Sequence, residues 1–212
     1  TMRRRPLADL KNHEAGLLLR DWRFWARADQ LAPPGKWRIW LFIGGRGAGK
    51  TRSGAEWIAH GAARGRMRRI GLVGATRFDA RSVMVEGESG LLRAAPAALF
   101  EPSNGRLLWP GGAVATILSA EEPDSFRGHQ FDAVWGDEWA KWRDPQGALD
   151  MALMALRLGR DPRAMLTSTP RNIPALVNLM RSDGVVVTRS RTADNGANLA
   201  SGVVAAMERR YG

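Results

Sequence analysis

Short apolar runs separated by longer mixed segments recur along the chain and predict alternating strands and helices. The predicted strands are apolar, β-prone runs, and they occupy residues 37–43, 69–74, 133–136, 164–167 and 185–188. The predicted helices lie between the strands and occupy residues 51–63, 78–86, 146–158 and 173–181. Strands that alternate with helices in this way predict an α/β domain with a mainly parallel sheet.

Two segments depart from this alternation. Residues 107–109 and 113–118 are apolar runs joined by Pro110-Gly111-Gly112, and they predict a β-hairpin. Residues 14–30 carry aromatic side chains among charges and predict a helix that ends at Ala32-Pro33-Pro34-Gly35. We therefore expect a helical segment that precedes the α/β domain and packs on it.

The composition argues against several kinds of site. The 212 residues include no cysteine, so neither a disulfide framework nor a thiolate metal site can form. His13, His60 and His129 lie far apart in sequence, which argues against a histidine zinc site. No apolar run approaches the ~20 residues that cross a bilayer, and the first residues lack the apolar core of a signal peptide. We expect a soluble, intracellular protein with no membrane partner.

Arginine supplies nearly all of the positive charge. The formal net charge is +11, although lysine occurs only at Lys11, Lys36, Lys50 and Lys141. A GC-rich genome alone can produce such an arginine bias. A strongly basic chain nonetheless favours a polyanionic partner, because phosphate neutralisation and counterion release drive binding to nucleic acid. Nucleic acid is therefore the expected class of partner.

Residues 44–51 match G-x-x-x-x-G-K-[ST], the pattern of a phosphate-binding loop. The loop consists of Gly44, Gly45, Arg46, Gly47, Ala48, Gly49, Lys50 and Thr51. Its glycines let consecutive N–H groups face a polyphosphate, and the next helix adds its N-terminal dipole. Lys50 is suited to the β- and γ-phosphates of ATP, and Thr51 to Mg²⁺. A glycine-rich chain can match by chance, but the predicted strand before the loop and helix after it provide the required context.

The predicted strand at 133–136 ends in an acidic pair, Asp137-Glu138. A hydrolytic site needs one carboxylate to hold Mg²⁺ and a second to polarise water. Asp137 is the candidate for the metal and Glu138 for the general base. Acidic residues also occupy ordinary exposed strand ends, so the interpretation depends on the phosphate-binding loop upstream.

The predicted strand at 164–167 ends in consecutive hydroxyls, Thr167-Ser168-Thr169, before Pro170. Hydroxyls beside a nucleotide can hydrogen-bond to the γ-phosphate or to its attacking water, and so sense whether ATP is intact. Serine and threonine before proline are also good turn formers, and the sequence alone leaves that alternative open.

Taken together, these motifs resemble the large terminase subunit, the DNA-packaging ATPase of tailed bacteriophages, in the version found in phage-like gene transfer agents. The resemblance runs from about Trp22 to the C-terminus and rests on residues 44–57, 83–92, 125–128, 137–138 and 167–170. It implies a RecA-like fold of the kind in which an added strand carries the catalytic glutamate. It also implies a ring of subunits at the portal of an empty capsid, which hydrolyses ATP to push double-stranded DNA inside.

The resemblance also implies roles for individual residues. Lys50, Thr51, Asp137 and Glu138 keep their phosphate, metal and base roles, and Arg46 lies where relatives often have a basic residue that contacts phosphate. Arg52, directly after the loop, is assigned to the nucleotide-binding residues. Gln30 corresponds to a glutamine that reads adenine in relatives, and the aromatic Trp37 is near it in sequence. Ser168-Thr169 resemble the family's coupling motif.

Arg127 lies 11 residues before Glu138 and matches an Arg-Gly position proposed in relatives to act in trans as an arginine finger. A guanidinium inserted at the γ-phosphate stabilises transition-state charge, which makes the role physically sensible. In an arginine-rich chain, Arg127 could equally contact DNA or be merely solvated.

Large subunits of this family usually carry a second, nuclease domain with clustered carboxylates. After Arg171 only Asp183, Asp194 and Glu208 are acidic, and they are scattered. We expect an ATPase domain excised from a longer protein, without DNA cleavage. The expected parts are an N-terminal segment at 1–35, the ATPase core at 36–190 and a linker at 191–212. The expected partners are DNA, the portal protein and procapsid, and the small terminase subunit, in the cytoplasm of the bacterial host.

Three other function classes share part of this pattern. A helicase or recombinase ATPase would share the loop, the acidic pair and the basic charge, but would usually need a second motor domain or its own DNA loops. A small-molecule kinase would share the loop and little else, and a water-activating Glu138 would waste its phosphate donor. A non-enzymatic, nucleotide-gated DNA-binding module is the third alternative.

Overall fold

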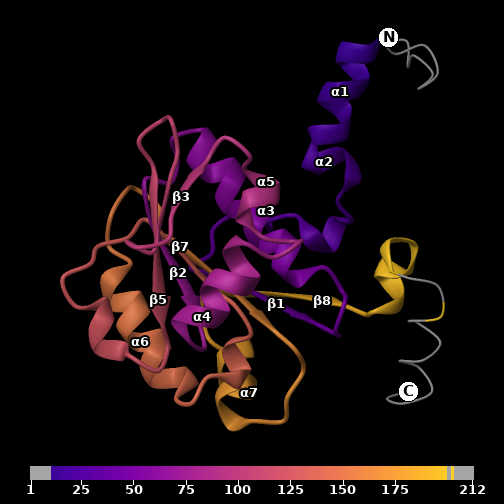
Figure 1. The fold of residues 1–212 in the computed structure, drawn as a ribbon. Coiled ribbons are helices and arrows are strands. Elements are labelled where there is room, and N and C mark those ends of the chain that lie inside the picture. Colours follow the sequence, from indigo (N-terminus) through magenta and orange to yellow (C-terminus); the bar gives the residue numbers. More distant parts are fainter. Residues whose placement is uncertain (1–10, 200–201, 203–212) are drawn as a thin grey trace.

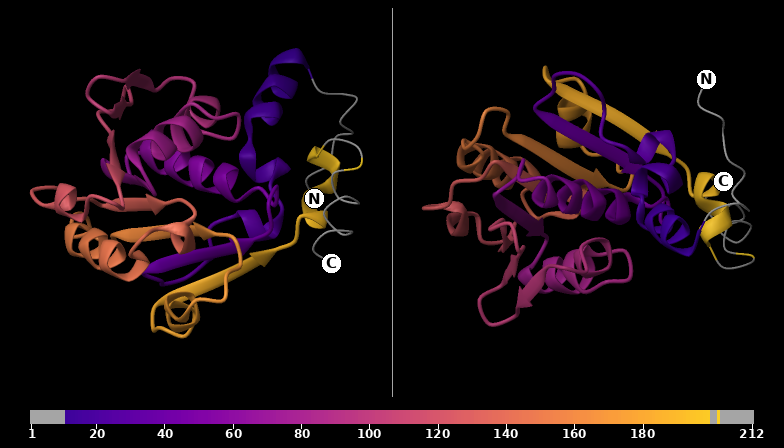
Figure 2. Two further views of the ribbon diagram at one scale, coloured as in Figure 1. Left: turned by 60° about the horizontal axis from the view of Figure 1, so that its bottom comes forward. Right: turned by 90° about the horizontal axis from the view of Figure 1, so that it is seen from above.

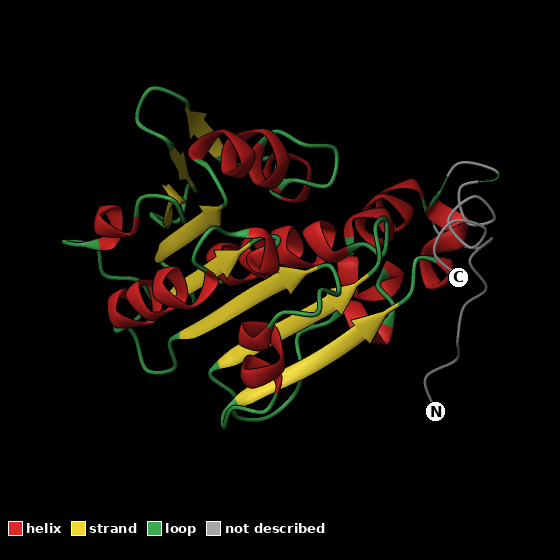
Figure 3. Ribbon diagram, turned by 90° about the horizontal axis from the view of Figure 1, so that it is seen from below, coloured by secondary structure: helices red, strands yellow, loops and turns green. Residues whose placement is uncertain are grey.

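Eight strands form one twisted sheet with helices on both faces (Figures 1 and 3). The computed structural model describes residues 11–199 and 202. In chain order the strands are β1 (Ile39–Gly44), β2 (Arg69–Gly74), β3 (Leu99–Glu101), β4 (Arg106–Leu108), β5 (Val114–Ser119), β6 (Ala133–Gly136), β7 (Arg163–Ser168) and β8 (Val185–Ser190). Their spatial order is β3-β4-β5-β2-β6-β7-β1-β8.

The strands from β5 to β8 in this spatial order run parallel to one another. The remaining pairs, β3 with β4 and β4 with β5, are antiparallel and form the edge of the sheet. The mainly parallel α/β sheet and the hairpin of β4 and β5 are therefore confirmed. Strand β7 is an added strand between β1 and β6, as in the predicted RecA-like fold. Glu138 follows β6, however, so the candidate glutamate lies beside the added strand and is not carried by it.

Helices cover both faces of the sheet, and the first alone among those of the described residues extends away from it. They are α1 (Asn12–Arg20), α2 (Trp22–Trp25), α3 (Lys50–Ala63), α4 (Arg77–Asp79), α5 (Leu91–Ala94), α6 (Pro145–Ala155) and α7 (Pro174–Met180), with a π-helix at Ala80–Val85. All six residues of β1 are buried, and its side chains alternate between the faces. Trp40 and Phe42 pack in the cluster that contains α3 and α5 residues, whereas Leu41 packs in the cluster that contains α6 and α7 residues.

The single helix predicted for residues 14–30 is wrong, because the segment is broken into α1, α2 and a 3₁₀ turn at Ala28–Gln30. Asp21 adopts an extended backbone between α1 and α2, and its side chain accepts a hydrogen bond from the Arg23 N–H, which caps α2. Ala26 is also extended and ends α2.

Two other helices differ from the prediction. The predicted helix at 78–86 is α4 followed by the π-helix, so its turns are wider than those of an α-helix. The predicted helix at 146–158 ends at Ala155, because Leu156 forms a parallel bridge with Phe131 beside the sheet.

The two ends of the described chain lie at the same end of the molecule (Figures 1 and 2). Helix α1 has no buried residue and extends away from the sheet, so only the part of the N-terminal segment from Trp22 onwards packs on the domain. Of the predicted linker at 191–212, only residues 191–199 and 202 are among the described residues, and the proposed division of the chain stays a prediction. Among the described residues, no helix has the length and apolarity needed to cross a membrane.

We expect Gly54→Ala to destabilise the domain. Gly54 lies on the face of α3 that touches the Trp135 ring, and a Cβ at this position would overlap the ring. Overpacking of this kind costs about 1–3 kcal/mol, which outweighs the better helix propensity of alanine. Urea unfolding measures the loss. Gly16→Ala in α1 is the matched control, because nothing lies within 4 Å of its added methyl group; equal stability of the two variants would contradict the prediction.

Candidate functional site

The phosphate-binding loop connects the end of β1 to the start of α3. Gly47 and Gly49 have φ values of 75° and 86°, in the left-handed region that glycine adopts without strain. Gly49 also abuts the Gln30 side chain, so that a Cβ would clash there. These two positions explain why the loop needs glycine, and α3 directs its N-terminus at the loop.

Lys50 is buried at the start of α3 and lies across the loop. Its Nζ donates to the carbonyl oxygens of Gly44 and Gly45, each at 3.0 Å. The same Nζ lies 3.4 Å from Glu138 Oε1. The first two predicted motifs therefore meet in space through an ion pair between Lys50 and Glu138.

Glu138 follows β6 in a conformation that its neighbours hold in place. Its φ of 52° is the only positive value of a non-glycine residue in the described part of the chain. The Thr169 N–H and hydroxyl donate to Glu138 Oε2 at 3.1 and 2.7 Å. The Glu138 N–H donates to Thr167 Oγ1 at 3.2 Å. The hydroxyls at the end of β7, Thr167 within the strand and Thr169 just after it, thus orient the candidate base.

Burial alone would raise the pKa of the Glu138 carboxyl, but Lys50, the Thr169 hydroxyl and Lys141 outweigh it and hold the pKa below its ordinary value. Lys141 Nζ lies 3.5 Å from Glu138 Oε2. The carboxylate is therefore ionised at neutral pH, as a general base must be.

Asp137 lies at the end of β6 and is buried. Burial raises the pKa of its carboxyl to about 6, against a hydrogen bond from the Thr167 hydroxyl that lowers it. Thr51 and Asp137 line the same hollow of about 260 Å³, together with Glu138. A hydroxyl and a carboxylate are oxygen donors of the kind that Mg²⁺ prefers, so these two residues fit the predicted metal role.

A larger hollow of about 1030 Å³ opens over the loop. Its lining includes most of the predicted nucleotide-binding group, namely Arg46, Gly47, Ala48, Gly49, Lys50, Thr51, Arg52 and Gln30, and also Glu138. Arg46 is exposed. Arg52 pairs with Glu56 at 2.6 Å and stacks on Trp22 at 5.6 Å.

The remaining predicted site residues do not line the larger hollow. Gly44 and Gly45 accept the Lys50 hydrogen bonds, and Ser168 Oγ accepts from the Ala140 N–H at 3.4 Å. Arg127, in contrast, has a 75% exposed side chain that pairs with Asp124 at 3.1 Å, and it lines neither hollow. The expectation that Trp37 lies near a bound adenine is not supported, since Trp37 is buried against Trp40 and Trp57.

Several residues at the site belong to no motif that the sequence analysis could identify. Trp22 and Trp25 line the larger hollow, where the sequence had suggested Trp37 instead. Arg27 and Asn195 bind the outer side of the loop through hydrogen bonds to Ala48 O and Gly47 O. Only their adjacency in the folded chain reveals them, because 168 positions separate Arg27 from Asn195.

We expect Asp137→Asn to stabilise the metal-free domain at neutral pH. A carboxyl whose pKa folding raises from 3.8 to about 6 destabilises the native state above pH 6, by about 3 kcal/mol at most. The cost falls as pH decreases towards 3.8, where both states bind the proton. Urea unfolding in EDTA should therefore show a gain at pH 7.5 that shrinks towards pH 4. Exposed Asp183→Asn is the control, and a gain that does not depend on pH would contradict burial of the charged carboxylate as its cause.

Solved structures that resemble this chain include phage packaging proteins. The large terminase of a thermophilic bacteriophage has a TM-score of 0.67 at 14% identity, over 92% of this chain and 49% of that chain. The large terminase ATPase domain of Thermus phage P74-26 has a TM-score of 0.58 at 19% identity, over 83% of each chain. The N-terminal domain of the bacteriophage phi29 DNA packaging ATPase has a TM-score of 0.56 at 13% identity, over 72% of this chain and 90% of that domain. At these identities the likeness establishes the fold.

The chain spans about half of the length (49%) of the large terminase from the thermophilic bacteriophage. No curated protein matches it in sequence. The family model of the T4likevirus-type large terminase subunit, N-terminal, matches residues 41–184. This match includes the loop, the acidic pair and the hydroxyls at the end of β7, and it covers most of the chain. The chain therefore belongs to the large terminase subunit family and corresponds to the family's N-terminal region.

Proposed function

We propose that this domain hydrolyses ATP. The observation that supports the proposal most directly is the contact of 3.4 Å between Lys50 Nζ and Glu138 Oε1, which joins a phosphate-binding loop to an ionised, oriented carboxylate. Solved structures of the large terminase of the thermophilic bacteriophage hold ADP and ATP-γ-S, and they resemble this chain with TM-scores of 0.64 and 0.63. A nucleoside triphosphate is thus the proposed substrate.

In the proposed mechanism the loop and Lys50 bind the β- and γ-phosphates. Thr51 and Asp137 would hold Mg²⁺, which neutralises phosphate charge when bound. Glu138 accepts a proton from the attacking water. When Lys50 turns from Glu138 to the phosphates, the carboxylate loses its nearest cation and becomes more basic. The exposed Arg46 is free to reach a phosphate from the solvent side.

The proposed coupling element is the pair Ser168-Thr169. Thr169 donates two hydrogen bonds to Glu138 Oε2, so a change in the carboxylate on hydrolysis alters the end of β7 directly. Ser168 Oγ accepts from the Ala140 N–H, which belongs to the turn that follows Glu138. Through these contacts, a change at the γ-phosphate would alter the backbone at the ends of β6 and β7.

We further propose that the hydrolysis drives packaging of double-stranded DNA. Membership of the large terminase subunit family and the formal charge of +11 support this role. The proposed partners are the portal protein and procapsid and the small terminase subunit, with the domain in a ring of copies in the cytoplasm of the bacterial host. The helicase and kinase alternatives have no comparable support.

We expect Lys50→Ala and Glu138→Gln to separate binding from turnover. Loss of the Lys50 charge should weaken ATP binding by about 10- to 100-fold, because charge-assisted hydrogen bonds to phosphate disappear. Glu138→Gln should retain binding and lose turnover by on the order of 10²- to 10⁴-fold, the usual contribution of a general base. Calorimetry and phosphate release measure the two effects. Exposed Lys36→Ala is the control, and turnover by Lys50→Ala would overturn the site.

We also propose that Arg127 completes the site of a neighbouring copy. Its side chain is 75% exposed, and its one ion pair among the described residues is with Asp124. A guanidinium supplied in trans stabilises transition-state charge on the γ-phosphate. The exposed position of Arg127, on the loop before β6, suits an interface between copies.

Mixing two inactive variants tests this proposal. Arg127→Ala keeps its own site but supplies no finger, whereas Glu138→Gln supplies a finger but lacks a base. A mixture should recover turnover that neither variant has alone, and wild-type turnover per subunit should rise with protein concentration. The loss in Arg127→Ala should be on the order of 10³-fold, as for other arginine fingers. Exposed Arg160→Ala is the control, and full turnover by dilute Arg127→Ala would exclude a trans role.

A further inference from the structure

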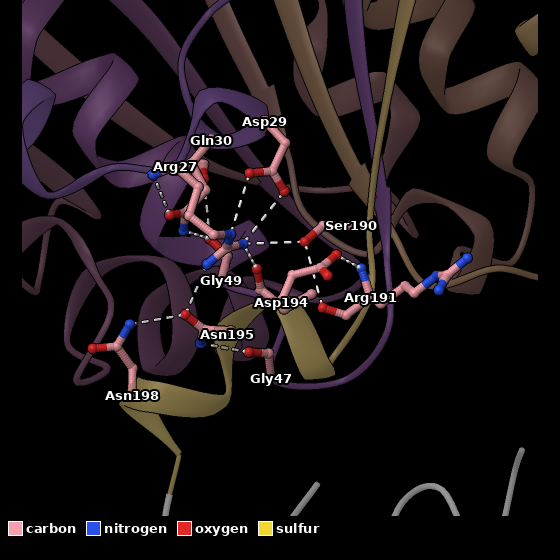
Figure 4. Close-up of polar contacts among 12 residues, drawn as sticks. Arg27, Asp29, Gln30, Gly47, Gly49, Ser190, Arg191, Asp194, Asn195 and Asn198 are labelled. Carbon is pink, nitrogen blue, oxygen red and sulfur yellow. Dashed lines mark hydrogen bonds and ion pairs between the residues drawn. The ribbon is translucent and has the colours of Figure 1, made fainter.

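The outer side of the phosphate-binding loop is held by side chains from two distant segments (Figure 4). Four consecutive loop carbonyls accept them. Arg46 O accepts from Thr192 Oγ1 at 2.8 Å, Gly47 O from Asn195 Nδ2 at 2.7 Å, Ala48 O from Arg27 Nη2 at 2.7 Å and Gly49 O from Gln30 Nε2 at 3.5 Å. Two of the donors precede β1, and two follow β8.

Arg27 joins these segments to each other as well as to the loop. Its Nη1 donates to Asn195 Oδ1 at 2.8 Å, and its Nη2 donates to Ser190 Oγ at 3.1 Å. Asp29 accepts from the Arg27 Nε at 3.2 Å, which fixes the plane of the half-buried guanidinium. The planar guanidinium holds several donors in a fixed fork and reaches acceptors on four residues here, whereas a lysine ammonium concentrates its three donors at one point.

Asn195 lies in the 3₁₀ turn Ala193–Asn198, the first structure after β8. Its amide uses both ends, because Nδ2 donates to Gly47 O while Oδ1 accepts from Arg27 and from Asn198 Nδ2. The turn is therefore docked on the loop through Asn195 and Arg27, and through Thr192 at its start.

These contacts hold the carbonyl side of the loop peptides, which determines the direction of their N–H groups. A trans peptide group is planar, and its N–H points opposite to its carbonyl. The four held carbonyls belong to the peptide groups that carry the N–H groups of Gly47, Ala48, Gly49 and Lys50. The Ala48 N–H donates to Gly45 O at 3.2 Å within the loop, and the N–H groups of Gly47, Gly49 and Lys50 face away from the held carbonyls. The guanidinium at Ala48 O also adds positive charge close to the loop, which favours an anion.

We propose that Arg27 and Asn195 are positioning residues for phosphate binding, and that they make nucleotide affinity depend on whether the turn at 193–198 is docked. The inference rests on the proposed binding of ATP at the loop. Because coupling between two equilibria is reciprocal, a bound nucleotide holds the turn more firmly in place. The chain that leaves the domain after β8 thus responds to the nucleotide through the loop, and its Asn195 and Asn198 also line the larger hollow over the loop.

Nucleotide affinity tests the first half of the proposal. We expect ADP to bind about tenfold more weakly to Arg27→Ala and to Asn195→Ala than to wild type, because each loses hydrogen bonds that hold the loop. Arg27→Lys should recover part of the lost affinity, since the lysine ammonium keeps the positive charge but lacks the fixed fork of the guanidinium. Arg20→Ala in α1 is the matched control, because that arginine is exposed and far from these contacts. Thermal unfolding without nucleotide separates lost affinity from lost stability.

Hydrogen exchange tests the second half. ADP should slow the exchange of amides in residues 193–199 of wild type, and this protection should be absent in Arg27→Ala and Asn195→Ala at saturating ADP. Equal affinities for wild type and both variants, or equal protection in all three proteins, would overturn the proposal.

The two proposals fail in different ways. If wild type binds ADP and Lys50→Ala does not, while the Arg27 and Asn195 variants match wild type, only the positioning role is wrong. If wild type itself binds no nucleotide, the proposed function is wrong, and the positioning role is wrong with it.

Discussion

The chemistry proposed for this domain depends on the hydrogen-bond register of three parallel strands. Strand β7 lies between β1 and β6, with Ser168 beside Ile43 and Leu166 beside Gly136. All three strands consequently end at the same edge of the sheet, where the phosphate-binding loop, the acidic pair and the hydroxyls begin. A slip of one residue would turn the side chains of a strand to the opposite face of the sheet. The side chains buried on both faces prevent such a slip, and they therefore also fix the alignment of the site residues at the strand ends.

Two adjacent carboxylates at this edge have opposite shifts in pKa. The pKa of Asp137 is raised to about 6 because the group is buried, whereas that of Glu138 is lowered because cations and hydroxyls outweigh burial. A pair of acids whose environments separate their pKa values is typical of sites in which each acid has its own role. The left-handed backbone of Glu138 contributes to this difference, because it turns the second side chain away from the buried position of the first.

The sequence predicted the parts of the site that local patterns encode. The phosphate-binding loop, the strands beside it and the acidic pair follow from residue types at short spacing, and the structure brings them together as expected. The sequence did not predict the break at Asp21 or the π-helix at Ala80–Val85, because both depend on capping and packing rather than on periodicity. Nor did it predict the contact of Arg27 with Asn195, since no pattern within a window of sequence relates residues so far apart.

The contacts on the outer side of the loop also bear on where this domain begins and ends. Judged by its hydrophobic clusters, the domain extends from Trp37 to Val187. Judged by the groups that hold the loop, it extends from Arg27 to Asn195. A chain cut at the bounds of the hydrophobic clusters would keep the core residues but lose the donors from Arg27 and Asn195 to the loop carbonyls. The flanking segments therefore belong to the domain through the geometry of the loop that they hold and not through its hydrophobic core.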